Sequence, residues 1–239
     1  MKLEGRNAVA EALNAGRNID KILAQNSADV KNLTREAVKM GIKVQYVDKH
    51  VLDEQSVTKK HQGIIAFASD YKYSTVEDIV NYAKAKKEDL LVLILDGVED
   101  PHNLGSILRV AECAGAHGVI IPKNRAVPVN ETAVKVSAGA SERVKVAKVT
   151  NLNSTINELK KIGVFVYSAD MDGEVMYKTN LKGNIAIVVG GEGTGVSALT
   201  RKNSDAIISI PMFGKINSLN ASVSAGIVLY EAVRQRIKG

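Results

Sequence analysis

The pattern of apolar and polar positions changes in strength along the chain. Over the first 70 residues, short runs at helical spacing alternate with short runs at strand spacing. This pattern predicts helices over 5–16 and 27–41, and strands over 21–25, 43–48 and 61–69. The alternation of such short elements indicates a small α/β domain.

From residue 90 the apolar runs become longer and more continuous, beginning with LLVLILD. Runs of this kind are typical of strands that are buried on both faces. We expect strands over 90–96, 117–122, 164–170, 184–190 and 206–212, and helices over 106–116, 130–143, 155–163 and 221–238. Because the strands alternate with helices, the sequence predicts an α/β fold built on a parallel sheet with helices on both faces.

The segment between these two regions ends in a charged stretch, AKAKKED, that is low in apolar residues. Ser74 and Glu77 have the spacing of a capping box, which predicts a helix over 75–86. We interpret residues 71–89 as a linker between a domain over 1–70 and a domain over 90–239.

The composition of the chain narrows the class of protein to which it can belong. The 239 residues are 45% hydrophobic and 24% charged, as in ordinary globular proteins, and the net charge of +6 fits a polyanionic partner. Cys113 is the single cysteine, which excludes an internal disulfide framework and a cysteine-based zinc site, and we expect it in the core. The sequence has no signal-peptide core and no apolar stretch of membrane-spanning length, so we expect a cytoplasmic protein without a membrane partner.

In a parallel sheet, ligands bind at the carboxyl ends of the strands, so the loops after three apolar runs are candidate sites. The first loop is the stretch 96–109, which follows a strand and opens a helix, and a helix start explains its Asn103 and Gly105 as turn and cap residues. Arg109 fits less well, because it stands among apolar helix residues and opposes the helix dipole. A structural role and a site role both stay open for Arg109.

The other two loops are rich in glycine and in small neutral polar residues. GGEGTGVS, over 190–197, lets the backbone approach a ligand closely, and its Glu192 suits a cationic or hydroxyl-rich ligand better than a phosphate. SLNASVSAG, over 218–226, has more polar side chains than a helix cap needs, which suggests recognition through neutral hydrogen bonds. The three loops contain no Ser–His–Asp set, and the sequence contains no HExxH-type metal pattern. The residues alone therefore indicate an α/β enzyme with a mostly neutral ligand pocket.

Three stretches in these loops, NLGSILR, VVGGEGTGVS and IPMFGKINSLNASVSAG, closely resemble the three ordered motifs of the SpoU (TrmH-like) branch of the SPOUT methyltransferases. EGRNAVAEAL and KKHQGIIAFAS resemble the small substrate-binding domain of the same family. Within the branch, the pattern is most similar to bacterial 23S ribosomal RNA guanosine 2′-O-ribose methyltransferases.

The resemblance implies a SPOUT domain whose C-terminal segment forms a deep trefoil knot. It also implies a homodimer, an RNA substrate, S-adenosylmethionine as methyl donor and no metal. Residues expected to bind the donor are Gly190, Gly191, Gly193, Ile210, Met212, Ser218, Leu219 and Ser222.

The resemblance further implies a catalytic group of Arg109, Asn103, Glu192 and Asn220. Because a guanidinium resists deprotonation, we expect Arg109 to bind a neighbouring phosphate and to stabilise the developing alkoxide. Glu192 would then accept the hydroxyl proton or hold the arginine in place.

In the first domain, Arg6 and Asn7 are the expected RNA contacts, with a helix-start role as the alternative. Two other functions stay open: methylation of transfer RNA, and a non-catalytic RNA-binding assembly factor. The intact catalytic group speaks against the second of these.

Overall fold

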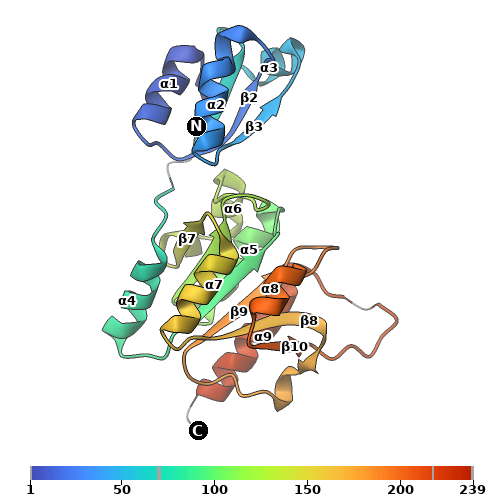
Figure 1. Ribbon diagram of the computed structural model, residues 1–239. Helices are drawn as coiled ribbons and strands as arrows, with labels where there is room; N and C mark the ends of the chain where they lie inside the picture. Colours follow the sequence, from blue (N-terminus) through green and yellow to red (C-terminus); the bar gives the residue numbers. More distant parts are fainter. Residues whose placement is uncertain (1, 69–70, 217, 238–239) are drawn as a thin grey trace. The chain divides into compact units, whose positions relative to one another are not determined.

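The computed structural model describes residues 2–68, 71–216 and 218–237 (Figure 1). The chain divides into two compact units, Met1–Lys72 and Tyr73–Gly239. Each unit has its own β-sheet, of four strands in the first unit and six in the second.

The first unit alternates short strands and helices, as the sequence predicts. Its elements are β1 (Lys2–Glu4), α1 (Arg6–Asn14), β2 (Ile19–Ala24), α2 (Lys31–Lys39), β3 (Lys43–Tyr46), α3 (Lys49–Gln55) and β4 (Ile64–Ala68). The strand order is β1-β4-β2-β3, with β2 and β3 parallel and β4 antiparallel to both of its neighbours. Val9, Ile22 and Ile64 lie in the core between α1, α2 and the sheet. The short β1 and α3 are absent from the sequence prediction.

The second unit contains one parallel sheet with helices between its strands. Its elements are α4 (Val76–Lys86), β5 (Leu91–Asp96), α5 (Pro101–Cys113), β6 (Gly118–Pro122), α6 (Glu131–Val136), β7 (Lys145–Val149), α7 (Leu152–Lys161), β8 (Phe165–Val175), β9 (Ile185–Gly190), α8 (Ala198–Asn203), β10 (Ala206–Ser209) and α9 (Ala221–Arg236). The five predicted strands are all present, and the predicted α/β class is confirmed. The sequence prediction lacks β7 and α8.

The strand order of this sheet is β10-β8-β9-β5-β6-β7, and every neighbouring pair is parallel. The chain runs from β5 outwards to β7 and then returns to the other side of β5, where β9 pairs with it. Val92 and Ile94 of β5 pack in a core that includes residues of α4 and α7, while Leu93 and Leu95 face the opposite side and are also buried. Both faces of the sheet are therefore covered.

The predicted linker, residues 71–89, carries α4, which is part of the second unit. Ile79 of α4 lies so close to Gly118 of β6 that a side chain at position 118 would overlap it.

The predicted capping box of Ser74 and Glu77 is wrong by one residue. Thr75 caps α4, and Thr75 and Asp78 exchange the two capping hydrogen bonds. The backbone of Ser74 instead donates to Val146, beside β7.

The predicted helix over 130–143 is interrupted. α6 ends at Val136, because Ala138 and Gly139 both have positive φ, at 51° and 89°. Such φ values lie outside the right-handed helical region.

The trefoil knot that the family resemblance implies for the C-terminal segment stays a prediction.

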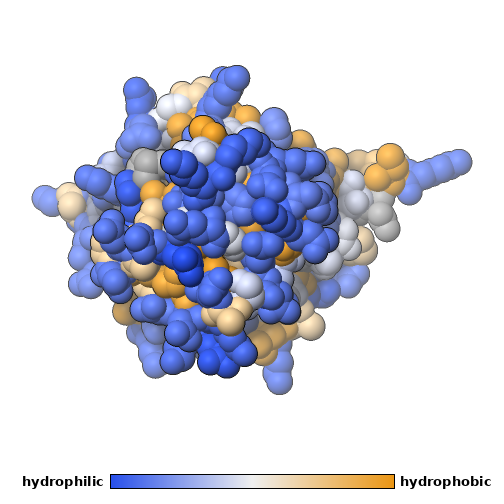
Figure 2. All heavy atoms as spheres, turned by 90° about the horizontal axis from the view of Figure 1, so that it is seen from above, coloured by the Kyte–Doolittle hydropathy of each residue, from blue (hydrophilic) through white to orange (hydrophobic). Residues whose placement is uncertain are grey.

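Figure 2 shows one face of the molecule, on which hydrophilic side chains predominate. The connection from β10 to α9 projects to the right in Figures 1 and 2, and it carries two highly exposed apolar side chains, Phe213 and Ile216. Within the described ranges, no helix combines the length and the apolarity that crossing a membrane requires.

Candidate active site

The three candidate loops meet at the carboxyl ends of β5, β9 and β10. β5 and β9 pair as far as Asp96 and Gly190, and the backbone of Gly191 then donates to the carbonyl of Asp96 at 2.9 Å. The Asp96 carboxylate accepts a hydrogen bond from the backbone of Ser197 at 3.0 Å. The glycine-rich loop after β9 is thus fixed at both of its ends to the last residue of β5.

Two glycines of this loop are required by the close approach of backbone segments. A side chain at Gly190 would overlap the backbone of Gly195, and one at Gly191 would overlap the carbonyl of Gly97. The glycines therefore let the loop fold back on itself and against the loop after β5.

Asn103 at the start of α5, Glu192 in the loop after β9 and Asn220 at the start of α9 form one hydrogen-bonded cluster. Asn103 Nδ2 donates to Glu192 Oε1 at 2.9 Å, and Asn220 Nδ2 donates to the same oxygen at 2.6 Å. Asn220 Nδ2 also lies 2.9 Å from Asn103 Oδ1. Two amides thus hold one carboxylate oxygen, which fixes the orientation of Glu192.

The orientation of Asn220 is fixed in turn by helix α9. Its Oδ1 accepts hydrogen bonds from the backbone of Ser222 at 2.9 Å and of Val223 at 3.4 Å, so Asn220 is the N-cap of the helix. The hydroxyl of Ser222 donates to the same oxygen at 2.6 Å. Asn103 lies inside the first turn of α5 and is buried, so its expected place as a turn or cap residue is wrong. Asp100 is the N-cap of α5.

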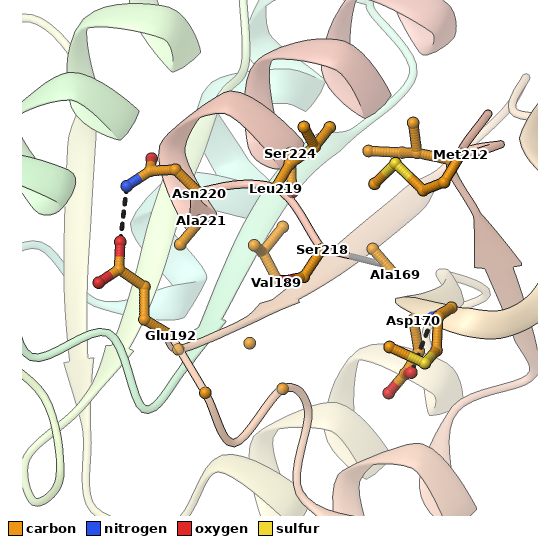
Figure 3. A pocket seen from close by; sticks show the side chains of 16 residues that line it. Ala169, Asp170, Val189, Glu192, Met212, Ser218, Leu219, Asn220, Ala221 and Ser224 are labelled. Atoms are coloured by element: carbon orange, nitrogen blue, oxygen red, sulfur yellow. Dashed lines mark hydrogen bonds between the residues drawn. The ribbon is translucent and has the colours of Figure 1, made fainter. Parts of the chain in front are cut away.

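A cavity of about 430 Å³ opens beside this cluster. Seven of the eight residues expected to bind the donor line it: Gly190, Gly191, Gly193, Ile210, Met212, Ser218 and Leu219. Ser222 is not among the lining residues, and its hydroxyl donates a hydrogen bond to Asn220. The lining is mainly backbone and apolar side chains, with Glu192 at one side and Asp170 at the other (Figure 3).

β8 contributes three lining residues that the sequence analysis missed, Ala169, Asp170 and Met171, at the point where its pairing with β9 ends. The signal was present, since Ala169 and Asp170 are the last two residues of the predicted strand VFVYSAD and Met171 follows it, so they lie at a strand end, like the other loops. The order of the strands, which places β8 directly beside β9, is not visible in the sequence.

Arg109 lies away from the cavity that Asn103, Glu192 and Asn220 adjoin. It is six residues beyond Asn103 on α5, a rise of about 9 Å along the helix axis. Its exposed side chain lines a second, smaller cavity of about 180 Å³ together with Glu112, Cys113 and Arg143. Cys113 is exposed there, so its expected place in the core is wrong.

In the first unit, Arg6 and Asn7 are exposed at the start of α1. The backbone of Arg6 donates to Gln62 Oε1 at 3.1 Å, and its guanidinium lies 3.8 Å from the carboxylate of Asp29. His61 has a structural role, because it is buried and its ring bonds Asp53 and the backbone of Gly63, both at 3.0 Å.

Within the described part of the chain, no group of three or more His, Cys, Asp or Glu side chains is placed to hold a metal ion.

The chain has recognisable relatives in both units. Residues 90–230 match the SpoU rRNA methylase family, and residues 2–74 match the domain described as RNA 2′-O ribose methyltransferase substrate binding. A Bacillus subtilis (strain 168) protein, provisionally named TrmH family tRNA/rRNA methyltransferase YacO, is 44% identical over 237 residues, which cover 97% of this chain and 94% of that protein.

Solved structures show the same architecture. The AdoMet-bound rRNA methyltransferase from Sinorhizobium meliloti is 25% identical with a TM-score of 0.63, covering 99% of this chain and 88% of that one. The SpoU methyltransferase AviRb from Streptomyces viridochromogenes, in complex with AdoMet, has a TM-score of 0.64 at 24% identity and covers 100% of this chain and 91% of that one, which shows a shared fold. The fold is thus that of the SPOUT class of methyltransferases. Within that class, the chain belongs to the SpoU rRNA methylase family.

Proposed function

We propose that this protein is an S-adenosylmethionine-dependent RNA 2′-O-ribose methyltransferase, and that its substrate is a guanosine of 23S ribosomal RNA. The observation that carries the proposal is the cluster of Asn103, Glu192 and Asn220 at one side of a cavity that is lined mainly by glycine backbone and apolar side chains. Membership of the SpoU family supports methyl transfer to RNA.

The cavity suits S-adenosylmethionine in size and in chemistry. Its volume of about 430 Å³ lies within the usual range for small-molecule sites. Val189, Ile210 and Leu219 offer apolar surface to a purine, and the glycine backbone can approach it closely. Glu192 favours a cationic ligand, and the donor carries a sulfonium whose methyl group is electrophilic. The AdoMet-bound Sinorhizobium relative supports the same choice.

The reaction needs a base that accepts the hydroxyl proton, and it needs the oxygen, the methyl carbon and the sulfur to lie in line. The ribose 2′-oxygen attacks the methyl carbon, the carbon–sulfur bond breaks with its electron pair moving to sulfur, and the hydroxyl proton passes to a base. We assign that base to Glu192. Asn103 and Asn220 both donate to its Oε1, so Oε2 is the oxygen assigned to the substrate hydroxyl. Holding the three reacting atoms in line supplies much of the rate enhancement.

Arg109 lies outside this cavity, so the proposal gives it a role in a homodimer. α9 packs against α5, which carries Arg109, and exposes Val223 and Tyr230 at 48% and 50%. These two residues lie about two turns apart on one face of α9. We propose that two copies pair across this face and that Arg109 of one copy serves the cavity of the other. There the guanidinium would bind a substrate phosphate and stabilise the alkoxide.

The first unit is assigned to RNA recognition, and Arg6 and Asn7 are its first candidate contacts. The match of residues 2–74 to the substrate-binding domain supports this assignment, and the net charge of +6 is favourable for a polyanion. We propose that the protein acts in the cytoplasm, where the ribosomal RNA of a bacterium such as that of the Bacillus relative is found.

The test is ribose methylation itself. Ribosomal and transfer RNA from cells with and without the protein are mapped for 2′-O-methylation. RNA from the deficient cells is then incubated with the purified protein and isotopically labelled methyl donor. We expect one guanosine of 23S RNA to lose its methyl group in the deficient cells and to regain it in vitro.

The matched control is Glu192→Gln, which should bind S-adenosylhomocysteine but leave the RNA unmethylated. Labelling of transfer RNA alone would assign the enzyme to that substrate instead. RNA binding with no labelled product would favour the assembly factor.

A further inference from the structure

The cavity has a second carboxylate, Asp170, which lies on the side opposite to Glu192. Figure 3 shows the two carboxylates apart, with Val189 and Ser218 between them. Asp170 reaches the cavity through an irregularity in the sheet. In the pairing of β10 with β8, the register passes from Ser168 directly to Glu174, so the intervening residues 169–173 leave that ladder.

Asp170 is held in place by an ion pair and by a hydrogen bond. Its Oδ2 lies 3.3 Å from Nη1 of Arg201 on α8, and its Oδ1 accepts a hydrogen bond from the backbone of Met171 at 2.7 Å. Its side chain is only 15% exposed. Arg201 also pairs with the more exposed Asp172 at 3.5 Å, and Asp172 lies outside the cavity wall. Asp170 is therefore a fixed acceptor whose charge is partly compensated.

The chemistry of the donor decides which of its groups faces this acceptor. If the proposed function holds, the sulfonium methyl lies at the Glu192 side, and the adenosine extends along the apolar wall of Val189, Ile210 and Leu219. S-adenosylmethionine can donate hydrogen bonds from its α-ammonium, its adenine amino group and its two ribose hydroxyls. The positive Arg201 beside Asp170 repels an ammonium, whereas a neutral diol needs no uncompensated charge. A carboxylate also offers acceptors to both hydroxyls at once.

We propose that Asp170 accepts hydrogen bonds from the ribose hydroxyls of the methyl donor, and that Arg201 is the residue that positions it. This assignment rests on the proposed function and gives the cavity a polar anchor at each end. It makes Asp170 a determinant of specificity for a ribonucleoside, because an unpaired buried acceptor is costly when the hydroxyl is missing.

The experiment is calorimetric titration of the full chain with three ligands: S-adenosylhomocysteine, 5′-methylthioadenosine, which lacks the amino-acid arm, and 2′-deoxy-5′-methylthioadenosine. Asp170→Asn should lower the binding affinity for the first two ligands by similar factors, about ten- to a hundredfold, because both ligands retain the ribose. Asp172→Asn is the matched control, since it loses a carboxylate from the same arginine outside the cavity, and it should stay within about twofold of wild type.

Wild type should bind the deoxy ligand about tenfold more weakly than the ribose ligand, and Asp170→Asn should lose most of this preference. Arg201→Met should lose part of the preference, and Arg201→Lys should restore some of it. The wild-type preference needs no variant, so a folding defect in the variants does not remove the test.

Three results would overturn the inference. Equal wild-type affinity for the ribose and deoxy ligands would show that the 2′-hydroxyl is unrecognised. A loss confined to S-adenosylhomocysteine would assign Asp170 to the amino-acid arm. Wild type that binds none of the ligands would reject the proposed function, and this inference with it.

Discussion

The amide nitrogen of Asn220 lies 2.6 Å from Oε1 of Glu192, and this contact joins the start of α9 to the loop after β9. The oxygen of the same amide caps α9 through the backbone of Ser222 and Val223. One side chain thus uses its donor for the site and its acceptor for the helix.

Asn220→Asp separates these two roles. Asp caps a helix as well as Asn does, but it replaces the donor with an oxygen that faces Glu192, and two carboxylates repel. We expect a melting temperature within a few degrees of wild type, measured by circular dichroism, and methyl transfer at least about a hundredfold slower.

Asn220→Ala is the comparison, because it removes the cap as well. It should be equally slow and should also lower the free energy of unfolding by about 1 kcal/mol. An Asp variant that retains near wild-type activity would remove Asn220 from the catalytic group.

Mixing two inactive variants tests the role of Arg109 across a homodimer. Arg109→Ala and Glu192→Gln should each be inactive alone. If the arginine of one copy serves the cavity of the other, a mixed dimer contains one site with both residues intact. Co-expression should then restore methyl transfer, measured with labelled donor, in about half of the sites of each mixed dimer.

The control for that experiment is a mixture of Glu192→Gln with Asn103→Ala. Both of these residues belong to one chain's own cluster, so this mixture should stay inactive. Failure of the first mixture to recover activity, with mixed dimers verified by differential tagging, would place Arg109 in the site of its own chain.

Glu4 predicts a pH dependence of the first unit. Desolvation acts to raise its pKa, but hydrogen bonds from the side chain of Thr58, the backbone of Val57 and the side chain of Ser56 outweigh it and lower the pKa to about 2. A carboxyl whose pKa is lower in the folded state stabilises that state above its unfolded pKa, near 4.5, and the contribution is lost as the pH falls towards 2.

Hydrogen–deuterium exchange of β1 and β4, corrected for the intrinsic rate at each pH, measures this contribution. We expect Glu4→Gln to reduce protection strongly at pH 7 and progressively less towards pH 3. Glu11→Gln, an exposed change on α1, should leave protection unchanged at both values. A gap between wild type and Glu4→Gln that is constant with pH would contradict the assignment.

The sequence predicts the site residues correctly where polar side chains directly follow a predicted strand. The three polar loops were found because each follows an apolar run, and in a parallel sheet those ends lie at one edge. Asp170 follows the same rule and was missed, because nothing in VFVYSAD indicates that β8 lies beside β9. Strand order is decided by packing between distant segments, and spacing along the chain does not contain it.

Local ambiguity explains other errors. In STVED, both Ser74 with Glu77 and Thr75 with Asp78 have capping-box spacing, and the choice depends on a bridge between Ser74 and Ala147 of β7. β7 itself was missed because it carries two lysines, although their ammonium groups lie over the rings of Tyr82 and Tyr73 at 5.3 and 5.1 Å. The long aliphatic stems of lysine let a strand carry charge and still cover apolar surface.

The backbone crowding at Gly190 and Gly191 limits how this cavity could be re-engineered to accept a bulkier methyl-donor analogue. A side chain at either position would overlap backbone atoms of the neighbouring loop, so we expect substitutions there to displace the cavity wall. A library should therefore hold both glycines constant and vary Ile210, Met212 and Leu219, whose side chains form the adaptable part of the wall.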